Sequence, residues 1–136
     1  MSLNSIYDIA GSSLNAQTLR LNTIASNMAN AETAAASPDA VYKARRPVFS
    51  EVMRSAQMEL GSQVEVREVL QSQADPLMRY EPNNPLANED GNVFYPNVNV
   101  VAEMADMMSA TRNYQTSVEV MSNARRMQER LLSLGQ

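Results

Sequence analysis

Side chains that commonly carry out enzyme chemistry are scarce in this chain of 136 residues. It contains no histidine and no cysteine, and Lys43 is its only lysine. These absences exclude histidine-based acid–base catalysis, thiol chemistry and the usual zinc ligand sets. The remaining routes are a pair of carboxylates or a Ser–Lys pair, but the acidic residues are scattered along the sequence. We therefore expect that the protein is not an enzyme.

Lys43, Arg45 and Arg46 form the basic cluster that precedes the C-terminal region. A solvated loop is the default interpretation, and contact with an acidic neighbouring protein is the alternative. The net charge of −4 and the pI near 4.8 argue against a nucleic-acid partner, because phosphate binding needs clustered positive charge. No run of about eighteen apolar residues occurs, so we expect no direct membrane insertion.

The distribution of proline indicates how the chain is organised. All six prolines lie between residues 38 and 96, and proline is excluded from helix interiors. We therefore expect an N-terminal helix within residues 1–33, an irregular or β-containing middle region over 34–96, and a C-terminal helix within 97–136.

The N-terminal region carries an unbroken apolar repeat with a spacing of four and three residues. Its members are Leu3, Tyr7, Ala10, Leu14, Gln17, Leu21, Ile24, Met28 and Ala31. A repeat of this period is typical of helices that wrap around partner helices. Only Asp8 and Arg20 are charged before residue 32, and the other flanking side chains are mostly amides and hydroxyls. This composition suits a helix surrounded by other protein.

The C-terminal region predicts a second long helix. Asn99 is the expected N-cap, and Glu103 and Asp106 follow early, where acidic groups favour the helix dipole. A second repeat consists of Val100, Met104, Met107, Thr111, Tyr114, Val118 and Met121, and it continues less regularly through Ala124, Met127, Leu131 and Leu134. About thirty-five helical residues would measure about 50 Å. A single helix of that length has no hydrophobic core of its own and needs another helix to cover it. We expect this helix to pair antiparallel with the first.

The middle region shows shorter and less decisive patterns. Residues 41–49 are expected to be extended with a break at Pro47, whereas 50–60 fit a short helix capped by Ser50, or equally a strand or loop. Residues 64–70 and 77–80 predict two short strands that pair as a hairpin or small sheet. The expected fold is therefore mainly α: long terminal helices paired antiparallel as a coiled-coil-like unit, with a small irregular, β-containing middle.

Two helices that pack along one face each leave their other faces exposed. A monomeric helical hairpin is one interpretation, but polymerisation through the terminal helices explains the uncharged surface better. The candidate subunit-interface residues are Leu14, Leu21, Asn22, Ile24, Asn27, Met28, Asn30, Met104, Met107, Thr111, Tyr114, Val118 and Met121. No catalytic, cofactor-binding or metal-binding residue is expected.

Several segments resemble a known family. Residues 19–33, LRLNTIASNMANAET, resemble the N-terminal signature of bacterial flagellar rod and hook proteins. Residues 91–107, GNVFYPNVNVVAEMADM, together with 113–115 (NYQ) and 118–121 (VEVM), are similar to the proximal rod proteins of the FlgC type. The resemblance is close at both ends of the chain and loose in the middle, and the short length also fits a proximal rod protein.

The resemblance implies a structural subunit of the flagellar basal-body rod, which transmits torque from the motor to the hook and filament. It implies export through the flagellar type III apparatus without a cleaved signal peptide, and assembly in the periplasm. The implied partners are copies of itself, neighbouring rod proteins and, in transit, the export apparatus; no cofactor is implied. A helical adaptor or chaperone-like binding module of a type III export system is the alternative.

Overall fold

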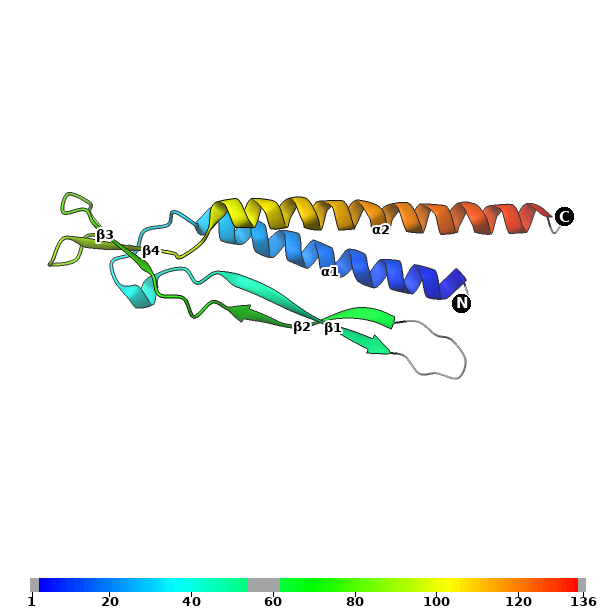
Figure 1. Ribbon diagram of the computed structural model, residues 1–136, viewed down its shortest axis with the longest axis horizontal. Coiled ribbons are helices and arrows are strands. Elements are labelled where there is room, and N and C mark those ends of the chain that lie inside the picture. The colour runs from blue at the N-terminus through cyan, green and yellow to red at the C-terminus, as the bar shows by residue number, and fades with distance from the viewer. Residues whose placement is uncertain (1–2, 54–61, 135–136) are drawn as a thin grey trace.

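The computed structural model describes residues 3–53 and 62–134 as two long helices and four strands. In chain order the elements are α1 (Leu3–Asn30), a short 3₁₀ turn η1 (Pro38–Ala40), β1 (Arg45–Met53), β2 (Ser62–Gln71), β3 (Leu77–Tyr80), β4 (Asn92–Tyr95) and α2 (Val100–Leu134). The molecule is elongated, with α1 lying between α2 and the β1–β2 hairpin (Figure 1). The β3–β4 sheet lies at one end, and the start of α1 and the end of α2 lie at the other.

The central position of α1 explains its low charge. Ala10, Ala16, Ile24 and Ala31 are buried, and α1 contacts both α2 and the hairpin. Two sides of the helix are therefore covered within the chain itself. The exposed positions that remain form one stripe of mostly small or amide side chains: Asp8, Asn15, Thr18, Asn22, Ala25 and Ala29.

Helix α2 begins where the sequence predicts. The backbone N–H of Ala102 donates to Asn99 Oδ1 at 3.1 Å, which confirms Asn99 as the N-cap. The helix runs antiparallel to α1 (Figure 1), and polar contacts mark the register along its length. These contacts are Asn27–Glu103, Arg20–Asp106, Ser13–Ser117 and Tyr7–Gln128, at 3.2, 3.0, 2.9 and 3.5 Å.

The prediction of a mainly α fold with a small irregular middle is wrong, because the chain is mixed α/β. The middle region forms two antiparallel sheets, β1–β2 and β3–β4, and the first has strands of nine and ten residues. Its hairpin packs along α1, so it forms a full layer of the molecule (Figure 1). Paired Phe49 and Val66 illustrate why the hairpin forms, since aromatic and β-branched side chains fit a half-buried pleated surface.

The strand pairing also differs from the expected one. Strand β2 pairs with β1, and β3 pairs with β4, whereas the sequence favoured pairing of the second and third strands with each other. Strand β1 continues through Pro47 and includes residues 50–53, so the strand alternative holds there and the short helix does not. The rest of that segment, 54–60, lies outside the described residues. Proline is accepted because each strand of a two-stranded sheet keeps one edge free of ladder hydrogen bonds.

The hydropathy of the two helices bears on whether either could cross a membrane. Within residues 3–53 and 62–134, neither helix combines the length and the apolar character that a membrane crossing requires.

Candidate subunit interface

Helix α2 leaves a large amount of apolar side chain uncovered. Val101 is 76% exposed, Met108 67% and Leu132 69%. The further large apolar side chains exposed on this helix are Val100, Met104, Tyr114, Val118, Val120, Met127 and Leu131. Isolated exposed apolar residues are common, but a concentration of them along one helix marks a binding surface.

Small residues, not these large ones, face α1. Ala110 is 0% exposed and Ala124 4%, and Ser117 shares a hydrogen bond with Ser13 of α1. These positions repeat at seven-residue intervals and include Glu103, which is also buried. The small side chains allow the helices to approach closely, so the large apolar residues of α2 remain available for contacts outside the chain.

The repeat predicted for α2 lies beside the face that contacts α1. Met104, Thr111 and Val118 each follow a residue of the α1-facing series by one position, which places them about 100° around the helix. All three are exposed, Tyr114 is 37% exposed, and Met107 and Met121 are half-buried. The periodicity therefore identified a real apolar stripe, but most of that stripe points away from α1.

Four methionines bring this stripe together with α1 in a shallow groove. Its lining residues are Met28, Met104, Met107, Met108, Thr111, Arg112 and Gln115, and its volume is about 490 Å³. Flexible thioether side chains adapt to irregular apolar surfaces. The side chains that line the groove are therefore suited to contact an apolar surface of another helix, and Arg112 is the charged residue among them.

The candidate residues on α1 separate into three groups. Ile24 and Asn27 are buried within the chain, whereas Asn22 is exposed. The half-buried members are Leu14, Leu21, Met28 and Asn30. The Asn30 amide donates to the Ser26 carbonyl oxygen of its own helix at 2.8 Å. Met28 is thus the α1 candidate that combines with the α2 stripe most directly, because it lines the groove with Met104 and Met108, whereas Asn22 belongs to the exposed stripe of α1.

Sequence reasoning missed several exposed apolar residues of α2. Val101, Val120 and Leu132 fall outside the predicted repeat and its continuation. The sequence signal that could have found these residues is that α2 is apolar on more than one face, since a single repeat cannot include all of its apolar side chains.

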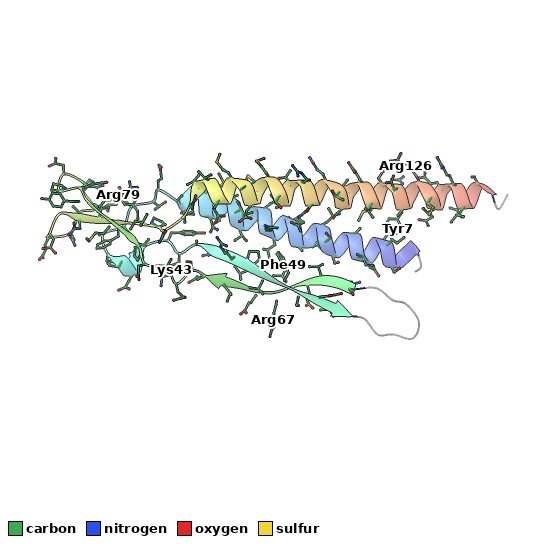
Figure 2. All side chains as sticks on the ribbon, in the orientation of Figure 1. Tyr7, Lys43, Phe49, Arg67, Arg79 and Arg126 are labelled. Atoms are coloured by element: carbon green, nitrogen blue, oxygen red, sulfur yellow. The ribbon has the colours of Figure 1, made fainter. Side chains whose placement is uncertain are left out.

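The basic cluster adjoins a second pocket, between α1, the start of α2 and β1. This pocket, of about 310 Å³, is lined by Arg45 and Arg46 together with Arg20, Glu103 and Asp106, among others. Arg20 and Asp106 form an ion pair at 3.0 Å. Phe49 also lines the pocket and lies on the side of the hairpin that faces α1, whereas Arg67 points away (Figure 2).

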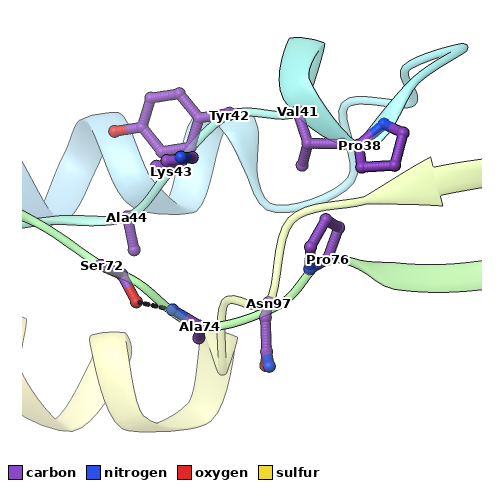
Figure 3. A pocket seen from close by; sticks show the side chains of 9 residues that line it. All are labelled: Pro38, Val41, Tyr42, Lys43, Ala44, Ser72, Ala74, Pro76 and Asn97. Atoms are coloured by element: carbon purple, nitrogen blue, oxygen red, sulfur yellow. Dashed lines mark hydrogen bonds between the residues drawn. The ribbon is translucent and has the colours of Figure 1, made fainter.

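A third pocket lies where residues 38–44 meet the connection between β2 and β3 (Figure 3). Pro38, Tyr42 and Pro76 are among its lining residues, and Ser72 Oγ accepts a hydrogen bond from the Ala74 backbone N–H at 3.2 Å. Its volume of about 20 Å³ accommodates little more than one water molecule. This pocket is therefore a packing feature, and the exposed helix surface is the better candidate site.

Comparisons with known proteins show which family the chain is similar to. A family model described as the flagellar basal body rod FlgEFG protein C-terminal region matches residues 89–134. The flagellar basal-body rod protein FlgC of Escherichia coli O6:H1 is 45% identical over 136 residues, covering 100% of both chains. FlgC of Yersinia enterocolitica is 42% identical over 136 residues, again covering 100% of both. FlgC of Agrobacterium fabrum is 36% identical over 125 residues, covering 90% of this chain and 88% of that protein.

Identity of this extent along the whole length includes the helices and the hairpin alike. The paired terminal helices, the exposed apolar stripe and the full-length relatives thus point to one conclusion. The chain belongs to the FlgC family of flagellar basal-body rod proteins and is a structural subunit of the rod.

Proposed function

We propose that the subunit joins the rod through its terminal helices and thereby transmits torque from the motor to the hook and filament. The observation that carries this proposal is the exposed apolar stripe of α2, with Met104 at 52% and Met108 at 67% exposure. An isolated subunit would leave this surface in water, whereas packing against neighbouring helices would bury it. The partners are copies of the same chain and neighbouring rod proteins.

The assembly core comprises residues 1–33 and 97–136, and the middle region 34–96 is carried by it. Within this core the contact residues include Asn22, Met28 and the α2 candidates Met104, Met107, Thr111, Tyr114, Val118 and Met121. The half-buried Leu14, Leu21 and Asn30 lie at the margins of the contact. Ile24 and Asn27 are buried within the subunit, where they hold its own layers together and make no contact with a neighbouring subunit.

Charge placed in the methionine groove tests this proposal. Met108→Glu introduces a carboxylate at an exposed position, so the isolated subunit keeps its fold and circular dichroism spectrum. In a flagellated strain that lacks its own copy of the gene, we expect this variant to abolish rod assembly and swimming, because the charge would be buried at the interface. Asn83→Glu is the matched control at an exposed residue outside the helices, and we expect normal swimming. Normal rods built from Met108→Glu subunits would overturn the proposal.

We also propose that the subunit reaches the periplasm through the flagellar type III export apparatus without cleavage of its N-terminus. Membership of a basal-body rod family supports this route over a role as an export adaptor. In a strain without a functional export apparatus, the subunit should remain in the cytoplasm. Mass spectrometry of subunits recovered from assembled basal bodies should find the encoded N-terminal peptide intact, and a shortened N-terminus would contradict the proposal.

A further inference from the structure

A buried amide side chain on α1 has hydrogen-bond partners for both its oxygen and its nitrogen. Asn27 lies on α1, is 1% exposed and uses both ends of its amide group. Its Nδ2 donates to the Arg45 carbonyl oxygen at 2.9 Å and to Glu103 Oε2 at 3.2 Å. Its Oδ1 accepts from the Arg45 backbone N–H at 2.9 Å and from the Tyr42 hydroxyl at 3.0 Å. An amide offers two donors and two acceptor sites, so this set uses its full capacity.

The four bonds connect three separate elements. Arg45 is the first residue of β1 and pairs with Gln71 of β2 across the sheet. The Asn27 amide binds both the N–H and the C=O of Arg45, as a neighbouring strand would at the free edge of β1. Glu103, which is 5% exposed, belongs to the first turn of α2. One side chain therefore joins α1, the base of the hairpin and the start of α2.

The hairpin is held less firmly farther from its base. The Val64 backbone N–H donates to Ser12 Oγ of α1 at 3.2 Å, and this bond is exposed to solvent. Val52 and Val64, toward the far end of the hairpin, are 36% and 38% exposed, so this part buries only some of its apolar surface. Hydrogen bonds in a buried, low-dielectric site are stronger and more directional than exposed ones. The orientation of the hairpin is thus determined mainly at its base.

We infer that Asn27 is the positioning residue that fixes the β1–β2 hairpin relative to the α1–α2 pair. Within the proposed rod, this joint forces the β1–β2 hairpin to rotate together with the helices. The subunit therefore transmits torque without bending at the base of the hairpin. The functional part of this inference rests on the proposed role of the terminal helices. Tyr42 supports the joint, since its hydroxyl contacts both Asn27 and Ser26, the latter at 3.1 Å.

Hydrogen–deuterium exchange on the free, full-length subunit tests the joint independently of assembly. Asn27→Asp keeps the acceptor oxygen but removes both donors and places a carboxylate beside the Arg45 carbonyl and Glu103. We expect exchange of the β1 and β2 amides to rise about tenfold or more, because a buried polar group loses its partner. The central peptides of α1 and α2 should change less than about twofold. Asn22→Asp, the same substitution on the exposed face of α1, should leave the hairpin unchanged.

Two results would overturn the joint. Unchanged exchange in the hairpin would show that Asn27 does not hold it, and an equal rise in the helices and the hairpin would show a general stabilising role only. Tyr42→Phe is a milder variant that removes a single donor and keeps the chain folded. It should raise hairpin exchange selectively by a smaller factor, and no selective rise would equally contradict the inference.

Motility under load tests whether the joint transmits torque. Subunits with Asn27→Asp should still assemble rods, because the α2 stripe is intact, but swimming speed should fall more steeply with medium viscosity than in the parent strain. Equal speeds at every viscosity would overturn the role in torque transmission. This outcome differs from failure of the proposed function, which would appear as normal assembly by Met108→Glu subunits.

Discussion

Ala110 lies on the face of α2 that packs against α1, with none of its surface exposed. Ala110→Leu adds three carbon atoms where the facing helix leaves no space. Such overpacking forces side chains off their rotamers or shifts the backbone, at a cost of about 1–3 kcal/mol. Intrinsic helix propensity changes by at most a few tenths of a kcal/mol, so the packing effect dominates.

The assay is urea denaturation of the purified subunit followed by circular dichroism. We expect the Ala110→Leu variant to lose about 1–3 kcal/mol of unfolding free energy. The matched control is Ala105→Leu, the same substitution at an exposed position of the same helix, which should change stability by less than about 0.5 kcal/mol. An Ala110→Leu effect no larger than the control would refute the reasoning, because it would show that α1 and α2 do not pack in this register in the free subunit.

Further substitutions at four positions test local features by the same denaturation assay. Gly91 has φ of 77°, and an added Cβ would lie 2.9 Å from the Tyr80 ring, so Gly91→Ala should destabilise the chain by roughly 1–2 kcal/mol. At Gly11, by contrast, an added Cβ would meet nothing within 4 Å, so Gly11→Ala should stabilise α1 by up to about 1 kcal/mol. Asn99→Ala removes the cap of α2 and should cost about 1 kcal/mol, whereas a glycine there should cost only a few tenths. Desolvation and the hydrogen bond to Glu81 raise the pKa of the Tyr95 hydroxyl above its usual 10.0, so stability should fall as pH rises above about 10, and Tyr95→Phe should reduce this fall. Equal effects of the two glycine substitutions, no cost at Asn99, or an unchanged alkaline slope would each contradict the corresponding prediction.

The helices were accessible from sequence because their signals are local. The confinement of proline to residues 38–96 and the cap at Asn99 predicted where α1 ends and where α2 begins. The pairing of β1 with β2 was not accessible, since it joins segments whose separate patterns also fit other structures. Pro47 suggested a break, and residues 50–53 fit the first turn of a helix; packing against α1 decides in favour of the strand.

Asn27 shows a second limit of sequence reasoning. An uncharged amide on an apolar helix face indicates a specific hydrogen-bonded contact, but not whether the partner belongs to the same chain. The structure supplies partners from β1 and α2, so the amide is used internally. For the α2 stripe, the sequence predicted a contact that lies outside the chain's own helix pair. Its periodicity was recognised, but the small residues beside it, such as Ala110, make the contact with α1.

Thiol labelling of assembled basal bodies tests the central claim most directly. The sequence contains no cysteine, so Met108→Cys carries a single thiol on the proposed contact surface. We expect a maleimide to label it rapidly in the free subunit, slowly in intact basal bodies, and fully once those basal bodies are denatured. Asn83→Cys reports access of the reagent to a surface outside the helices. Equal labelling rates of Met108→Cys in the free subunit and in the assembled rod would contradict assembly through the helix surface.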